Sequence, residues 1–159
     1  MPPEEIKGRD IIRTAAKRLT ADLMTNYLMG RLGVIVDGTA RDYQLIERQV
    51  QLLRTTLGYD CYMIFVNTSL DVALERNAGR IRRVPVDVTK QSWKIVQSNM
   101  GKFQYLFGRK NFIIVDNNNA NEDILKKVAK KIRIMMSNPI QSFTAKRWIV
   151  NQLKAKKRV

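Results

Sequence analysis

Short apolar runs alternate with stretches of helical periodicity along this chain, and the alternation constrains the fold more than any other feature. The runs lie at residues 31–36, 61–66 and 112–115. A strand that is apolar on both faces is typical of a parallel sheet covered by helices on both sides. The sequence therefore predicts an α/β fold with three layers, in which a parallel sheet is flanked by helices.

Apolar residues at helical spacing predict the helices between and after these runs. We expect helices over residues 4–29, 41–57, 68–74, 86–106 and 124–135, and a last short helix around 148–153. Gly58 is the expected stop of the second helix, and Asn138-Pro139 ends the fifth. We interpret residues 1–159 as one domain, with an α/β core over 1–137 and a helix with a basic tail over 138–159.

The charge is strongly basic and unevenly distributed. Lys and Arg number 29 against 14 acids, a formal net charge of +15. Every charged residue after Asp123 is basic, and Asp87 is the single acid between Arg76 and Lys110. This asymmetry indicates a nucleic-acid or nucleotide partner, and less often an anionic membrane. The alternative is a solvated basic surface with a tail that aids solubility.

Several classes of protein are excluded by composition. With no His and the single Cys61, a zinc site and an internal disulfide are both excluded, and Cys61 is expected to be a buried structural thiol. No apolar stretch has the length needed to cross a bilayer, so no membrane partner is expected. Residues 1–5 have no signal-peptide character, and a cytoplasmic location is expected.

Polar residues follow the first apolar run directly, in the order Asp37-Gly38-Thr39-Ala40-Arg41. In open α/β sheets, ligands sit at the carboxyl ends of the strands. The Asp37 carboxylate there could hold a magnesium ion, directly or through water. Thr39 and Arg41 could bind a substrate's phosphate or hydroxyl group. The alternatives are helix capping for Asp37 and Thr39 and a surface ion pair for Arg41.

A second group of candidate residues is a cluster of arginines between residues 76 and 85. Phosphoryl transfer spreads negative charge over several oxygens, so catalysis depends on cations brought to them. Arginine binds phosphate bidentately and keeps its charge. The cluster, which contains Gly79 and ends at Pro85, fits a mobile lid. The alternatives are a solvated basic loop and a contact to a nucleic-acid backbone without catalysis.

Together, the two groups resemble the P-loop kinase superfamily, in particular bacteriophage polynucleotide kinases and zeta-toxin kinases. Residues 36–41 are similar to the substrate segment of zeta-type kinases, and residues 76–88 to the lid of the phage enzymes. The resemblance implies ATP-dependent transfer of the γ-phosphate to a hydroxyl, on a polynucleotide, in the host cytoplasm if the gene is viral. It implies magnesium near Asp37, substrate at Thr39 and Arg41, and catalytic lid arginines at Arg76, Arg80 and Arg83.

One part of the family pattern is missing from this sequence. No Gly-x-x-x-x-Gly-Lys-Ser/Thr phosphate-binding loop occurs in it, and no general base can be assigned. We therefore expect a P-loop-kinase-like fold that is incomplete at its amino terminus, whose runs at 32–36 and 61–66 either pair directly or leave open edges. A complementing amino-terminal fragment or a homo-oligomer would cover such edges.

Two alternatives to a kinase remain open. One is a non-catalytic nucleic-acid-binding or virion-associated protein on a degenerate kinase scaffold. The other is a truncated gene product with no independent role.

Overall fold

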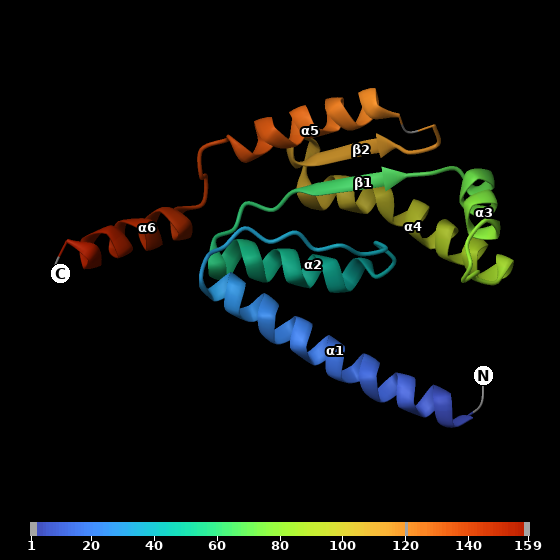
Figure 1. Cartoon of the computed structure of the whole chain (residues 1–159). Helices are drawn as coiled ribbons and strands as arrows, with labels where there is room; N and C mark the ends of the chain where they lie inside the picture. Colours follow the sequence, from blue (N-terminus) through green and yellow to red (C-terminus); the bar gives the residue numbers. More distant parts are fainter. Residues whose placement is uncertain (1–2, 120, 158–159) are drawn as a thin grey trace. The chain divides into compact units, whose positions relative to one another are not determined.

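The computed structural model describes residues 3–119 and 121–157. The chain divides into two compact units, residues 1–38 and residues 39–159. Figure 1 shows the order of the elements along the chain.

The first unit is a long helix followed by an extended segment. Helix α1 spans Pro3–Met29, and Gly30 and Arg31 form the turn that ends it. Residues 33–38 that follow are neither helix nor strand, so the strand expected over residues 31–36 is wrong. An apolar run forms a strand only when a neighbouring backbone receives its hydrogen bonds, and the sheet contains no part of this segment.

The second unit holds a parallel sheet of two strands. Strand β1 spans Met63–Asn67 and strand β2 spans Phe112–Asp116, with Met63 opposite Phe112 and Asn67 opposite Asp116. Helices α3 (Leu70–Ala78) and α4 (Val86–Phe107) make the connection between them. The α/β class and these two strands are confirmed. Within the described part of the chain the sheet has no further strand, so each strand has one open edge.

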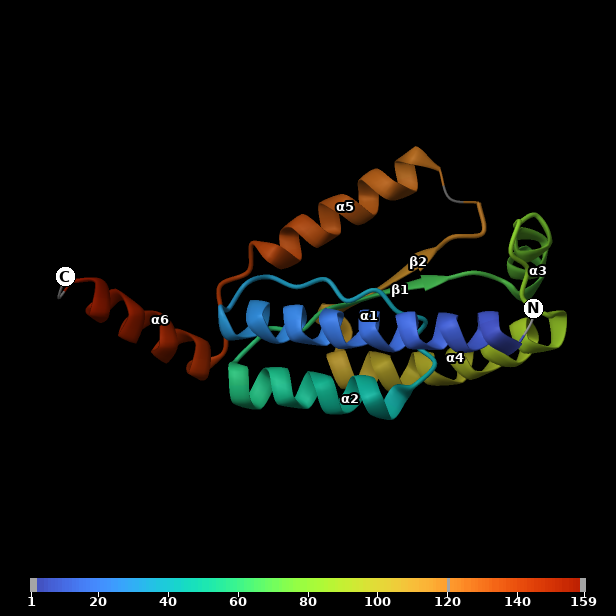
Figure 2. The same cartoon turned by 60° about the horizontal axis from the view of Figure 1, so that its bottom comes forward.

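Helices cover both faces of this sheet (Figures 1 and 2). On one face Phe65 and Phe112 pack with Phe103 of α4, whose side chain is fully buried. On the other face Ile113 and Val115 pack against α5, which spans Glu122–Met136. This second cover is partial, because Ile64 and Val66 of β1 keep 42% and 58% of their surface exposed.

Helix α2 spans Tyr43–Leu52 and continues through a π-helical turn, η1, over Leu53–Leu57. Gly58 ends it with φ of +73°, which confirms the predicted stop. Helix α6, Phe143–Lys156, begins beside this glycine. A Cβ at Gly58 would lie 2.7 Å from the Ala145 nitrogen and from Ser142 Oγ. The glycine therefore allows both the turn and the packing of α6.

Cys61 packs against the larger core but is half-buried rather than buried. Burial raises the pKa of its thiol, and the nearby Arg54 opposes this shift. A thiol that stays protonated at neutral pH is a poor nucleophile, in keeping with the structural role expected for it.

Candidate functional site

The predicted magnesium ligand and the predicted substrate residues fall in different units. Asp37 lies on the exposed extended segment of residues 1–38, whereas Thr39, also exposed, and Arg41 begin the second unit. Among residues 3–119 and 121–157, no three His, Cys, Asp or Glu side chains come together as a metal site. The metal role of Asp37 therefore stays a prediction, and so does the substrate role of Thr39.

The backbone of Arg41 is held by a buried asparagine of α4. Asn99 is 4% exposed, and its Nδ2 donates to the Ala40 carbonyl at 3.2 Å and to the Arg41 carbonyl at 3.0 Å. Ala40 has φ of +57°, a conformation that residues with a Cβ rarely adopt. Asp42 then caps α2 by accepting from the Leu45 nitrogen at 2.9 Å. Arg41 is thus fixed between a strained turn and a capped helix.

Arg41 lines an open cavity of about 550 Å³. The wall comes from the start of α2 and from the middle of α4: Arg41, Asp42, Tyr43, Gln44, Ile95, Asn99 and Lys102. The Lys102 ammonium lies 5.5 Å from the centre of the Tyr43 ring, within cation–π range. The Tyr43 hydroxyl donates to Glu47 Oε1 at 2.8 Å, and this bond raises the pKa of Tyr43.

The arginine-rich lid is closed at its base by another buried asparagine. Asn77 is 8% exposed; its Nδ2 donates to the Val84 carbonyl at 2.7 Å, and its Oδ1 accepts from the Val84 nitrogen at 2.9 Å. Between these residues the loop exposes Arg80 and Arg83, and Arg83 Nε donates to the Arg80 carbonyl at 3.4 Å. The loop is therefore a closed ring that presents cations to solvent.

Arg76 differs from the other two lid arginines because it is bound to the protein. Its Nη2 donates to the Asn118 carbonyl at 3.1 Å. Asn118 Oδ1 in turn accepts from the Ser69 nitrogen at 2.7 Å, and its Nδ2 donates to Asp116 Oδ1 at 2.8 Å. Arg76 thus ties the end of α3 to the loops that follow β1 and β2.

The carboxyl edge of the sheet contains polar residues that the sequence reasoning did not assign. Gln97 Nε2 donates to Asn67 Oδ1 at 2.8 Å, and Trp93 Nε1 donates to the Thr68 carbonyl at 2.8 Å. Asp116 ends β2 in the register position opposite Asn67. The sequence did contain a signal for this edge: an apolar strand ends in Asp116, and three asparagines follow it. Polar residues directly after a strand are typical of a ligand-binding edge in a parallel sheet.

Comparison with known families identifies the fold family. The sequence profile of a family described as an AAA domain matches residues 3–103, from α1 into α4. The chain belongs to this family. The match includes residues 37–41 and the whole lid, and it supports the predicted membership of the P-loop kinase superfamily. No curated protein and no solved structure matches the chain.

As an AAA-domain protein, the chain has a P-loop kinase-like nucleotide-binding function, and its α/β sheet fits a P-loop-like fold.

The arginines of the lid and the cations of the cavity, Arg41 and Lys102, are separate groups in the structure. On α4 the cavity begins at Ile95, which lies roughly 14 Å along the helix axis from Val86, the first residue of α4, at 1.5 Å per residue. Within the described residues, no helix is long and apolar enough to cross a membrane.

Proposed function

We propose that this AAA-domain chain is part of an ATP-dependent kinase of the bacteriophage polynucleotide kinase type. It would transfer the γ-phosphate to a hydroxyl of a polynucleotide, with magnesium as cofactor, in the cytoplasm or host cytoplasm. The observation that carries the proposal is the closed lid: Asn77 holds a ring of exposed arginines inside the segment that the kinase-like family covers.

In the proposed reaction the substrate hydroxyl oxygen bonds to the γ-phosphorus, the bond from the γ-phosphorus to the oxygen that bridges to the β-phosphate breaks, ADP leaves with that oxygen, and the hydroxyl proton passes to solvent. Arg80 and Arg83 would stabilise the charge that spreads over the phosphoryl oxygens, because their side chains are exposed on the loop. Arg76 would hold the lid to the carboxyl edge of the sheet through Asn118 as well as face the phosphates. Thr39 and Arg41 would bind the acceptor, and Asp37 would hold magnesium, which neutralises phosphate charge when bound.

The phosphate-binding loop, which this sequence does not contain, would come from a complementing amino-terminal fragment. Two features support a partner of this kind. Strand β1 has an open edge, and its side chains Ile64 and Val66 are exposed beside that edge. A homo-oligomer would cover the same edge without supplying the loop.

Equilibrium binding of a fluorescent ATP analogue, with and without magnesium, tests the proposal. We expect only weak binding by the chain alone, because it lacks the phosphate-binding loop, and micromolar, magnesium-dependent binding once a peptide that carries such a loop and its helix is added. In that mixture Arg80→Ala should weaken binding about tenfold, since a charge-assisted hydrogen bond is worth about 1.5–3 kcal/mol. Arg82→Ala is the matched control in the same loop and should bind as the wild type does. Absence of binding in the presence of the added loop peptide, or equal loss in the two variants, would contradict the proposal.

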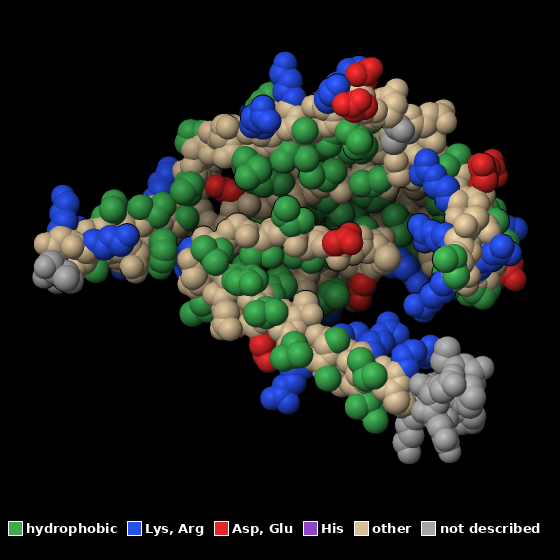
Figure 3. All heavy atoms as spheres, in the orientation of Figure 1, with side chains coloured by type: hydrophobic (Ala, Val, Ile, Leu, Met, Phe, Trp, Pro, Cys, Tyr) green, Lys and Arg blue, Asp and Glu red, His purple; other side chains and the backbone are tan. Residues whose placement is uncertain are grey.

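A second candidate function is non-catalytic binding of nucleic acid. Helices α5 and α6 carry exposed cations, shown as blue spheres along both helices in Figure 3. After Asp123 no acid opposes them in the sequence, and Phe143 is 77% exposed among them. Phosphate contacts need only Lys and Arg at the surface. Binding of DNA or RNA that falls steeply with salt and ignores ATP would favour this candidate.

A further inference from the structure

The cavity at the start of α2 brings together cations from elements far apart in the sequence. Arg41 precedes α2, and Lys102 lies on α4. We propose that this cavity binds a phosphate group of a nucleotide or oligonucleotide, with Arg41 and Lys102 as its cationic ligands and Asn99 as the positioning residue for Arg41. That the phosphate belongs to a nucleotide rests on the proposed function. The inference adds Lys102 and Asn99 to the residues proposed to bind the phosphate acceptor.

The charges that line the cavity favour an anion. Arg41 and Lys102 supply two positive charges, and the Asp42 carboxylate supplies the single negative charge among the lining residues. One oxygen of Asp42 already accepts a hydrogen bond from the Leu45 nitrogen. Arginine and lysine are the side chains that bind phosphate most often, by bidentate hydrogen bonds and as a compact charge respectively.

The size and lining of the cavity fit more than a bare ion. About 550 Å³ lies within the range of small-molecule sites. The Tyr43 ring and Ile95 provide an apolar portion beside the cations. A base or sugar can therefore contact this portion while the phosphate lies between Arg41 and Lys102.

Asn99 fixes the backbone that carries Arg41. One buried amide donates to two consecutive carbonyls, and those carbonyls belong to the left-handed Ala40 and to Arg41 itself. Without these bonds, Ala40 can relax toward a more common conformation, and the Arg41 side chain then leaves the cavity. Asn99 acts on the ligand through Arg41, because its amide hydrogen bonds go to the protein.

Fluorescence titration of the full chain tests the site without ATP or magnesium. The probes are a fluorescently labelled AMP and a labelled ten-nucleotide single-stranded DNA with a free 5′-hydroxyl. Binding of AMP identifies a phosphomonoester as the ligand, and binding of the DNA alone identifies a phosphodiester. For the probe that binds, Lys102→Gln should raise Kd about tenfold. The matched control is Lys94→Gln, which removes a charge from the same helix outside the cavity.

The control separates a site from general attraction by a basic protein. Lys94→Gln should change Kd less than twofold. Equal effects of the two lysine variants, or no binding of either probe, would overturn the proposal. Asp42→Ser gives a further test, because serine keeps the helix cap but removes the carboxylate. We expect it to tighten binding a few-fold, and weaker binding would show that the cavity does not take an anion.

A double-mutant cycle tests the positioning role of Asn99. Asn99→Ala should weaken binding in the wild-type background and have no further effect in the Arg41→Ala background. Additive losses would mean that Asn99 serves the fold alone and would overturn the positioning role. These titrations involve no phosphate transfer. The kinase proposal can thus fail through the ATP analogue while the cavity still binds its ligand, and the reverse also holds.

Discussion

The two units of the chain use apolar residues in opposite ways. Among the described side chains of the first unit, residues 8–38, many apolar ones at helical and strand-like spacing are exposed: Ile12 keeps 71% of its surface and Ile35 98%. In residues 39–159, the same kinds of pattern lead to a core around Phe65 and the fully buried Phe103. The spacing of apolar residues therefore predicts whether a segment is helical or extended. Whether those residues are buried depends on a second surface that packs against them.

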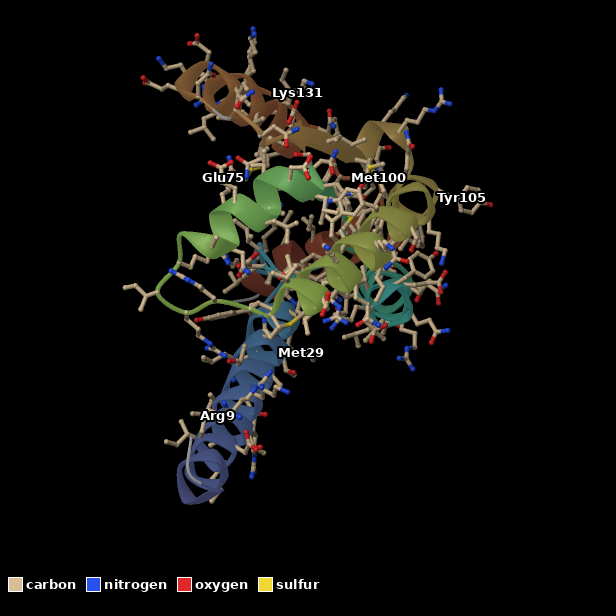
Figure 4. All side chains as sticks on the ribbon, turned by 90° about the vertical axis from the view of Figure 1, so that its right-hand side faces the viewer. Arg9, Met29, Glu75, Met100, Tyr105 and Lys131 are labelled. Carbon is tan, nitrogen blue, oxygen red and sulfur yellow. The ribbon has the colours of Figure 1, made fainter. Side chains whose placement is uncertain are left out.

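The largest effect should come from the core of the second unit. Phe103→Ala removes a fully buried ring that packs against Tyr43 at 5.3 Å between ring centres. We expect a loss of about 3–5 kcal/mol in the free energy of unfolding, measured by urea denaturation. Tyr105→Ala, on the same helix but 90% exposed and projecting outward in Figure 4, should cost less than about 0.5 kcal/mol. Equal losses of unfolding free energy in the two variants would contradict the contrast between a buried Phe103 and an exposed Tyr105.

The next effect should come from Gly58. Alanine there would place a Cβ against α6 at 2.7 Å and would strain a φ of +73°. We expect a loss of about 1–3 kcal/mol and faster proteolysis between α5 and α6. Gly101→Ala is the matched control, since nothing lies within 4 Å of its Cβ position in α4. That variant should gain roughly 0.5–1 kcal/mol by its higher helix propensity.

A comparable or smaller loss is expected from Asn77→Ala, which removes both hydrogen bonds to Val84. Leaving those backbone groups without their partner should cost about 1–3 kcal/mol. Trypsin should then cleave at Arg80 and Arg83 sooner than in the wild type. Asn77→Asp keeps the acceptor for the Val84 nitrogen and loses the donor, so its cleavage rate should be intermediate. Unchanged cleavage in both variants would show that the loop is held by other contacts.

The smallest effect should come from the first unit. Ile35→Ser replaces an almost fully exposed side chain in a segment outside the sheet. The free energy of unfolding should change by less than about 0.5 kcal/mol, as for other surface positions. A loss of 2 kcal/mol or more in urea denaturation would mean that Ile35 is buried in solution, and the comparison between the units would fail.

Much of the fold could be predicted from local patterns. The helices, both paired strands and the Gly58 stop follow from spacing and capping residues, which act within a few positions of the chain. The strand at residues 31–36 could not be predicted correctly, because its apolar run specifies burial but not a hydrogen-bonded neighbour. Whether such a neighbour exists is a property of the whole fold.

The candidate site also contains some residues that could be found from the sequence and others that could not. The arginines could be found from the sequence because a cluster of charge is visible there. Asn77 and Asn99 could not, because an isolated asparagine in a helical pattern resembles any exposed polar residue. Their importance comes from long-range geometry: Asn99 meets carbonyls nearly 60 positions earlier in the chain. Lys102 was missed for the same reason.

The two hydrogen bonds between Asn77 and Val84 allow the length of the lid to change without a change in the packing of the helices on either side of it. Both ends of the loop meet at one pair of hydrogen bonds, so residues can be inserted between them without displacing α3 or α4. The lid is therefore the place where this scaffold can acquire new sequence most easily. A grafted tag or recognition peptide at Ile81, which is fully exposed, would leave the core unchanged.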